Sequence, residues 1–166
     1  MPRKKKKRSD EPERGGNRVI ARNRKAFHDY AVGDRLEAGI ALVGSEIKSI
    51  RAGRVNLRDS YVHIRNGEAW LVGTHIAGYA QASYQDHDPL RERKLLLHRT
   101  EIQRWKARVD QRGFTIVPLS MYLKNNRAKV EIALVRGKRA YDKRQSIAER
   151  DSQRDMERAI KQQMYE

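Results

Sequence analysis

The histidines are the first residues to consider for catalysis or metal binding: His28, His63, His75, His87 and His98. No two of them stand four residues apart around a glutamate, the spacing by which a helix presents zinc ligands in a hydrolase. The chain has no cysteine, which excludes thiolate zinc sites and a cysteine nucleophile. The serines lack a G-x-S-x-G pattern, and the glycines form no P-loop or dinucleotide motif. We therefore expect neither an enzyme nor a metal or cofactor site, with a metal-dependent nuclease as the remaining enzymatic alternative.

Basic side chains interspersed with aromatic rings indicate a different chemistry. Lysine and arginine number 37 against 21 aspartates and glutamates, so the net charge is +16. Such a chain attracts polyanions, and aromatic rings can stack nucleotide bases while cations bind phosphates. A membrane surface is the competing polyanion, but no apolar stretch approaches the roughly 20 residues of a spanning helix and no signal peptide is evident. The sequence predicts a cytoplasmic nucleic-acid-binding protein.

The N-terminal segment, residues 1–18, differs from the rest in composition. Residues 4–8 are all lysine or arginine, and the segment lacks the periodic apolar residues that a folded element buries. We expect a disordered basic arm.

The strands that must position the basic residues are predicted from alternation and turn residues. Residues 36–42 alternate apolar with other residues, as in a half-buried strand. Asn66-Gly67 between two extended runs predicts a tight hairpin, and residues 124–127 divide a second hairpin. Pro118 lacks a backbone donor and is expected on an edge, at a bend or next to a bulge. Residues 19–137 should form one mainly β domain with flanking helices, an OB-like antiparallel β-barrel.

Two helices are predicted beside these strands. The first covers residues 46–51 with Ser45 as its cap, and its outer face presents Lys48 and Arg51. The second runs from Glu101 to about residue 112, is capped by Thr100, and buries a stripe that includes Trp105.

The C-terminal tail, residues 138–166, is nearly all charged and polar. As a helix it places its basic residues on one side and a narrow apolar stripe roughly opposite. The basic side comprises Arg150, Arg154, Arg158 and Lys161, and the stripe comprises Met156, Ile160 and Met164. Two interpretations remain open: a segment that folds against RNA, or a solvated helix with ordinary ion pairs.

Seven short motifs follow one another along the chain: NRKA at 23–26, HDY at 28–30, EAGI at 37–40, the segment 44–51, RKLLL at 93–97, GK at 137–138 and YDKR at 141–144. In this order, over about residues 20–150, they resemble the SsrA-binding protein family, also called small protein B. The resemblance implies an OB-like barrel that binds the tRNA-like domain of transfer-messenger RNA (tmRNA) and delivers it to stalled ribosomes for trans-translation. The alternative is a ribosomal or general single-strand RNA-binding OB protein.

The resemblance also implies an RNA-facing cluster at Glu37, Leu96 and Lys129. Lys129 can bind a phosphate, Glu37 can accept from a ribose hydroxyl or base edge, and Leu96 can pack on a ribose or base. Competing interpretations are that Leu96 belongs to the core and that Glu37 pairs with a nearby arginine. The remaining predicted RNA-binding residues are cations: Lys48, Arg51, Arg93 and Lys94.

For the tail, the resemblance implies a segment that is disordered in solution, enters the empty decoding site and becomes helical along the vacant messenger channel. The residues implied there are Gly137, Lys138, Tyr141, Asp142, Lys143 and Arg144. A long messenger RNA would exclude the tail from that channel. We expect a monomer whose partners are tmRNA and the ribosome, with no cofactor and no membrane.

Overall fold

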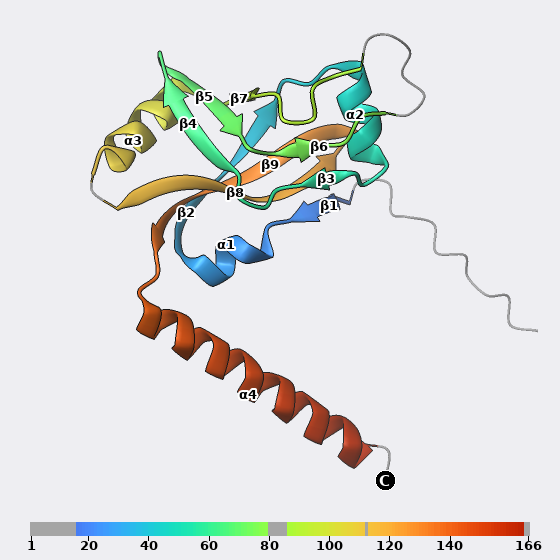
Figure 1. Cartoon of the computed structure of the whole chain (residues 1–166), viewed down its shortest axis with the longest axis vertical. Helices are drawn as coiled ribbons and strands as arrows, with labels where there is room; N and C mark the ends of the chain where they lie inside the picture. The colour runs from blue at the N-terminus through green and yellow to red at the C-terminus, as the bar shows by residue number, and fades with distance from the viewer. Residues whose placement is uncertain (1–15, 80–85, 112, 165–166) are drawn as a thin grey trace, which may run out of the picture.

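The computed structural model describes residues 16–79, 86–111 and 113–164, and the described part contains nine strands and four helices (Figure 1). In chain order they are β1 (Arg18–Arg22), α1 (Arg24–Asp29), β2 (Tyr30–Ile40), α2 (Gly44–Arg51), β3 (Val55–Asn56), β4 (Tyr61–Arg65), β5 (Glu68–Val72), β6 (His75–Ile76), β7 (Arg93–Leu96), α3 (Arg99–Val109), β8 (Phe114–Lys124), β9 (Arg127–Gly137) and α4 (Ala140–Met164).

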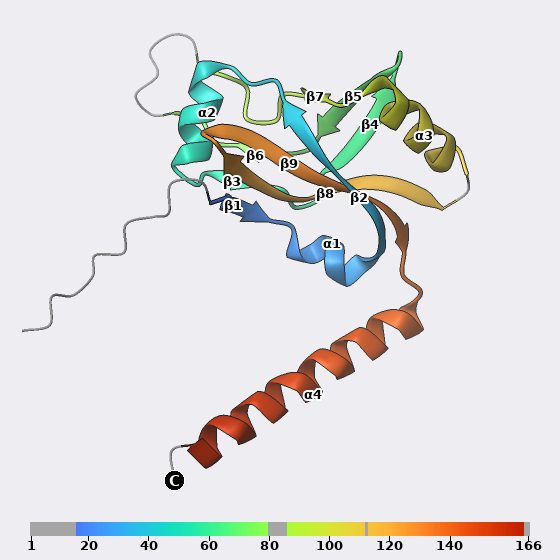
Figure 2. The same cartoon turned by 180° about the vertical axis from the view of Figure 1, so that it is seen from behind.

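Six antiparallel strands close into a ring in the order β8-β4-β5-β7-β2-β9, and the ring closes because β8 also pairs with β9. β1 pairs with residues 120–123 of β8, and β3 pairs with β6 in a separate two-stranded sheet. Alternate side chains point inward along each strand and fill the interior with apolar residues. Leu71, Met121, Val130 and Ile132 are completely buried there. The predicted barrel with flanking helices is confirmed (Figures 1 and 2).

Both predicted hairpins are present and share one turn geometry. Asn66 and Gly67 have φ of 52° and 71°, and Asn125 and Asn126 have φ of 51° and 61°. Two consecutive residues with positive φ form a type I′ turn, whose twist matches that of the flanking strands. Pro118 lies beside a register shift in the β8–β9 pairing, so its expected position next to a bulge is confirmed.

The start of each predicted helix differs from the expectation. The Glu46 carboxylate accepts a hydrogen bond from the Val43 backbone amide at 3.0 Å, and Glu101 does the same for His98 at 3.0 Å. A glutamate at the third helical position reaches back in this way and takes the capping role. Ser45 and Thr100 are therefore not the caps, and α3 ends at Val109 rather than near residue 112. The buried stripe of α3, with Trp105, is confirmed.

At the N-terminus, residues 1–15 of the expected arm lie outside the described residues. The expected boundary at residue 18 stays a prediction, although Arg18 itself belongs to β1 and pairs in register with Leu123 of β8.

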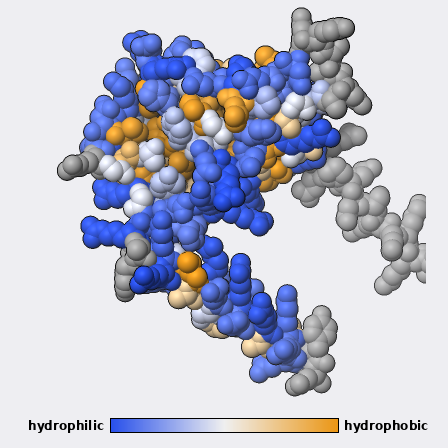
Figure 3. Space-filling view, viewed as in Figure 1, coloured by the Kyte–Doolittle hydropathy of each residue, from blue (hydrophilic) through white to orange (hydrophobic). Residues whose placement is uncertain are grey.

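The C-terminal tail forms α4, which leaves the barrel next to α1 and extends away from it (Figures 1 and 2). Met156, Ile160 and Met164 are all exposed, so the predicted apolar stripe has no cover within the described part of the chain. Hydrophilic residues make up most of the visible surface of α4 (Figure 3). The C-terminal helix is confirmed, whereas its formation from a disordered tail on the ribosome stays a prediction.

Candidate nucleic-acid interface

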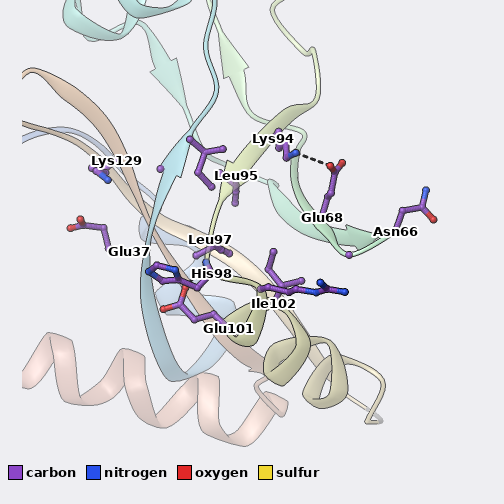
Figure 4. Close-up of a pocket in the computed structure, with 14 residues that line it drawn as sticks. Glu37, Asn66, Glu68, Lys94, Leu95, Leu97, His98, Glu101, Ile102 and Lys129 are labelled. Atoms are coloured by element: carbon purple, nitrogen blue, oxygen red, sulfur yellow. Dashed lines mark hydrogen bonds and ion pairs between the residues drawn. The ribbon is translucent and has the colours of Figure 1, made fainter.

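A groove of about 860 Å³ lies on the surface of the barrel, between β2, β7 and the start of α3. The β4–β5 turn forms one side of it through Asn66 and Gly67. Figure 4 shows the side chains that line this groove. Four of the predicted RNA-binding residues meet here: Glu37, Lys94, Leu96 and Lys129.

Glu37 projects from β2 and accepts hydrogen bonds from the Tyr122 hydroxyl and, at 3.5 Å, from the Lys124 ammonium. The hydrogen bond from Tyr122 lowers the pKa of Glu37, and the positive charges of Lys124 and Lys129 lower it further. The carboxylate therefore remains ionised at neutral pH as an acceptor in the groove. The side chains that pair with it are a tyrosine and a lysine, so the competing interpretation of an arginine partner is wrong.

Leu96 is 55% exposed, although its neighbour Leu95 is buried in the core. Adjacent residues of a strand point to opposite faces, so burial of Leu95 turns Leu96 toward solvent. Gly39 lies directly opposite on β2, and a Cβ at Gly39 would come within 3.1 Å of the Leu96 Cβ. The interpretation of Leu96 as a core residue is therefore wrong, and an apolar surface lies open in the groove.

Two lysines supply positive charge to the groove. The Lys94 ammonium is 2.7 Å from a Glu68 carboxylate oxygen, and both side chains are partly exposed. Lys129 on β9 lies directly opposite Gly39 and Tyr122 in its two neighbouring strands, which places it close to Glu37 (Figure 4). The groove thus combines an acceptor, an apolar surface and two cations, the combination by which proteins hold nucleotides.

Arg93 is a correction, because its side chain is completely buried and cannot contact RNA. Its Nε lies 2.8 Å from Glu46 Oε1, and its guanidinium also donates to the carbonyls of Thr74 at 2.9 Å and Pro89 at 3.1 Å. Arg91 donates to the same carboxylate at 2.7 Å. Burial opposes ionisation of Glu46, but these hydrogen bonds outweigh it and lower its pKa.

The two basic residues predicted on α2 lie outside the groove. Lys48 and Arg51 are both exposed, and the Lys48 ammonium is 5.4 Å from the centre of the Tyr79 ring. Neither lines the groove, so contact with the same RNA segment is not supported by this placement and stays a prediction.

Two cations at the tip of the β8–β9 hairpin were not predicted from the sequence as RNA-binding residues. Lys124 and Arg127 flank its turn and line a hollow of about 510 Å³ together with Glu37 and Lys129. Their spacing around two asparagines already placed them at a hairpin end. Their position beside Glu37 depends on β2 lying against β9, which pairing across the barrel decides.

The predicted tail residues lie apart from the groove. Gly137 ends β9 opposite Tyr30, and the Lys138 amide donates to the Asp29 carbonyl at 3.0 Å. Lys143 and Arg144 lie in the first turns of α4, as does the backbone of residues 141 and 142. The structure therefore separates the predicted site into a groove on the barrel and a helical tail.

Within the described residues, no group of three or more histidines, aspartates and glutamates could hold a metal ion. None of the helices in the described part is long and apolar enough to cross a membrane.

Comparison with known proteins is consistent across sequence and structure. The family model of the SmpB protein matches residues 20–162. The SsrA-binding protein of Roseiflexus sp. (strain RS-1) is 60% identical over 146 residues, which cover 87% of this chain and 92% of that protein. That of Desulfitobacterium hafniense (strain DSM 10664 / DCB-2) is 55% identical over 148 residues, covering 89% and 95%. A solved chain described as "tmRNA-SmpB: a journey to the center of the bacterial ribosome" is 46% identical with a TM-score of 0.62, covering 72% of this chain and 85% of that one. The chain therefore belongs to the SmpB protein family.

Proposed function

We propose that this protein binds tmRNA and acts with it on stalled ribosomes in trans-translation, with the barrel groove holding the tRNA-like domain of the RNA. The relatives are named SsrA-binding proteins, and the solved chain is described with tmRNA and the bacterial ribosome. The observation that carries the proposal is that one groove is lined by an exposed Leu96, the ionised Glu37 and Lys129. The protein performs this role in the cytoplasm, as a monomer.

Each groove residue has a distinct part in this proposal. Lys129 neutralises a phosphate, and Glu37 accepts from a ribose hydroxyl or a base edge. Leu96 packs on a ribose or base that would otherwise face water. Peptide transfer and tagging are chemistry of the ribosome, so the chain contributes binding and placement. Chelator-sensitive cleavage of RNA by the purified protein would contradict this assignment and favour a nuclease.

Variants of the groove test the RNA site. Leu96→Ala and Lys129→Ala should each weaken tmRNA binding about tenfold, because the first removes an apolar contact to a ribose or base and the second removes a charged contact to a phosphate. Filter binding measures the affinity, with bulk tRNA as competitor. The matched control is Lys106→Ala, because Lys106 is an exposed cation of α3 that does not line the groove. Unchanged affinity in both groove variants would contradict the site, and equal affinity for tmRNA and bulk tRNA would favour a general RNA-binding protein.

The tail forms a second functional unit in this proposal. Residues 19–137 hold the RNA, while residues 138–166 enter the decoding site and the messenger channel that a long message would occupy. α4 suits such a channel because it is long, carries Arg150, Arg154, Arg158 and Lys161, and leaves its apolar stripe exposed in the described structure.

Truncation before Lys138 separates the two units. It should leave tmRNA affinity within about twofold, because the groove contains no residue of the tail. Tagging of nascent peptides on stalled ribosomes should be abolished, and Arg144→Ala should reduce tagging partially. The tagging activity of both variants is measured with purified ribosomes stalled on a message without a stop codon. Parallel loss of tmRNA binding and tagging would refute the division into two units.

A further inference from the structure

A second hollow, of about 420 Å³, adjoins the groove where α2 begins. Gly39, Leu96 and Lys129 line both hollows, so the exposed Leu96 side chain stands at the border between them. A strand of RNA that packs on Leu96 therefore has a second place to bind within reach of its neighbouring nucleotide.

The second hollow combines apolar side chains from α2 with cations from β9. Val43 and the half-buried Ile47 provide the apolar surface at the start of α2. Arg127 and Lys129 provide the positive charge, and none of the described residues that line the hollow is acidic. This combination suits an anionic ligand with an apolar face, and a nucleotide has both a flat base and a phosphate.

Val43 is an unusual residue for its position. It is the N-cap of α2, with φ of −90° and ψ of 164°, and its side chain makes no capping hydrogen bond. Serine, threonine, aspartate and asparagine are preferred at an N-cap, and valine is among the least favourable residues there. The Val43 side chain is also 45% exposed, so it contributes little to the core. A residue that is unfavourable both for the helix start and for contact with water indicates a binding role.

Asn126 provides a polar group on the same hollow. It lies in the turn of the β8–β9 hairpin with φ of 61°, is exposed, and lines the hollow beside Arg127. An asparagine amide both donates and accepts hydrogen bonds, and the edges of nucleotide bases carry both kinds of partner.

We propose that this second hollow binds one unstacked base of tmRNA. The face of the base packs on Val43 and Ile47. Its edge forms hydrogen bonds with Asn126, and its phosphate lies at Arg127. Loops of folded RNA present such unstacked bases, and proteins read RNA sequence mainly at these bases. The inference rests on the proposed function and adds a base contact beyond the groove.

Val43→Ser separates RNA binding from stability. Serine is a favoured N-cap, so the melting temperature should not fall, whereas tmRNA affinity should fall about fivefold because the base loses apolar surface. Val43→Ile should keep the affinity, since it retains that surface. The matched control is Val19→Ser on β1, because Val19 is 44% exposed and lines neither hollow, so tmRNA affinity should be unchanged. Filter binding and thermal denaturation measure the two quantities.

Asn126→Gly tests the polar contact. Glycine adopts a positive φ without strain, so the turn is retained while the amide is removed. The loss of one hydrogen bond should again weaken tmRNA binding about fivefold. Dimethyl sulfate and a carbodiimide modify the pairing edges of RNA bases and identify the base concerned. One base that the unsubstituted protein protects should become reactive with Val43→Ser and with Asn126→Gly, and should stay protected with Val19→Ser.

The outcomes distinguish this inference from the proposed function. If Leu96→Ala and Lys129→Ala weaken tmRNA binding but Val43→Ser and Asn126→Gly do not, the second hollow is refuted and the proposed function stands. Unchanged tmRNA affinity with reduced tagging in Val43→Ser would also refute the base, and would indicate an apolar side chain of a ribosomal protein as the occupant. Failure of the unsubstituted protein to bind tmRNA would contradict both.

Discussion

Glu46 shows how one buried charge organises the region behind the groove. Its side chain and that of Arg93 are both completely buried, and Arg91 adds a second guanidinium from the adjacent loop. An unpaired charge inside a protein is costly, so each member of this cluster depends on the others. The cluster ties α2 to β7, the strand that also presents Lys94 and Leu96 to the groove.

Glu46→Gln should destabilise the fold by about 3–5 kcal/mol, because it leaves a buried guanidinium without its counter-charge. Urea denaturation followed by fluorescence measures the change. The comparison is Glu101→Gln, since Glu101 makes the same backbone contact at the start of α3 without a buried arginine and should cost about 1 kcal/mol or less. Equal losses in the two variants would mean that the capping contact, not the ion pair, matters at Glu46.

The same residue predicts a pH dependence. The pKa of Glu46 is lowered in the folded protein from its ordinary 4.5, so its contribution is complete above that value and is lost as the pH falls through the lower folded value. The stability difference between the unsubstituted protein and Glu46→Gln should therefore be constant at neutral pH and shrink below about pH 4.5. Denaturation midpoints between pH 7 and pH 3 measure it, and a difference that grows on acidification would contradict this sign.

At the scale of elements, the β4–β5 turn sets one side of the groove through its backbone conformation. Gly67 has φ of 71°, and a Cβ added there would meet nothing within 4 Å. Gly67→Ala should cost about 1–2 kcal/mol from left-handed backbone strain alone. Gly44→Ala is the matched control, because its Cβ also has free space but its backbone is helical, and it should be neutral or slightly stabilising. Thermal denaturation of both variants measures the change in stability. Equal losses of stability in the two variants would exclude backbone strain as the cause.

At the scale of the whole molecule, the net charge of +16 should dominate RNA affinity. If about six phosphates are neutralised, a threefold rise in salt weakens binding by roughly two orders of magnitude. Filter binding of tmRNA across a salt series measures the slope of the logarithm of affinity against that of salt. Lys129→Ala should reduce this slope by about 0.7 to 0.9, whereas Lys106→Ala should not change it. A slope near zero would contradict binding through phosphates.

Local sequence was sufficient for the elements whose determinants are neighbours in the chain. Alternation predicted the inward face of β2 around Ala38, and Asn66-Gly67 predicted its hairpin, because both signals depend on residues a few positions apart. The helix caps were mistaken, because both helices begin before the hydroxyl residue and Glu46 and Glu101 accept from the backbone amides of Val43 and His98 instead. The family resemblance predicted Glu37, Leu96 and Lys129 as RNA-facing residues, and strand pairing in the structure places all three in one groove.

In β7 the local sequence pattern does not settle which face of the strand points into the barrel. Alternation says only that Arg93 and Leu95 share one face and Lys94 and Leu96 the other, and each pair contains one charged and one apolar residue. The inward face was decided by Glu46, 47 positions earlier in the chain, which provides the buried counter-charge that Arg93 needs. The start of the C-terminal tail likewise depends on a distant partner, because Lys138 donates to the carbonyl of Phe27, 111 positions away in the chain. Sequence thus determined local form, charge and the family motifs, while tertiary structure decided which side chains face RNA, because partners distant in the chain determine the cost of burying a charge.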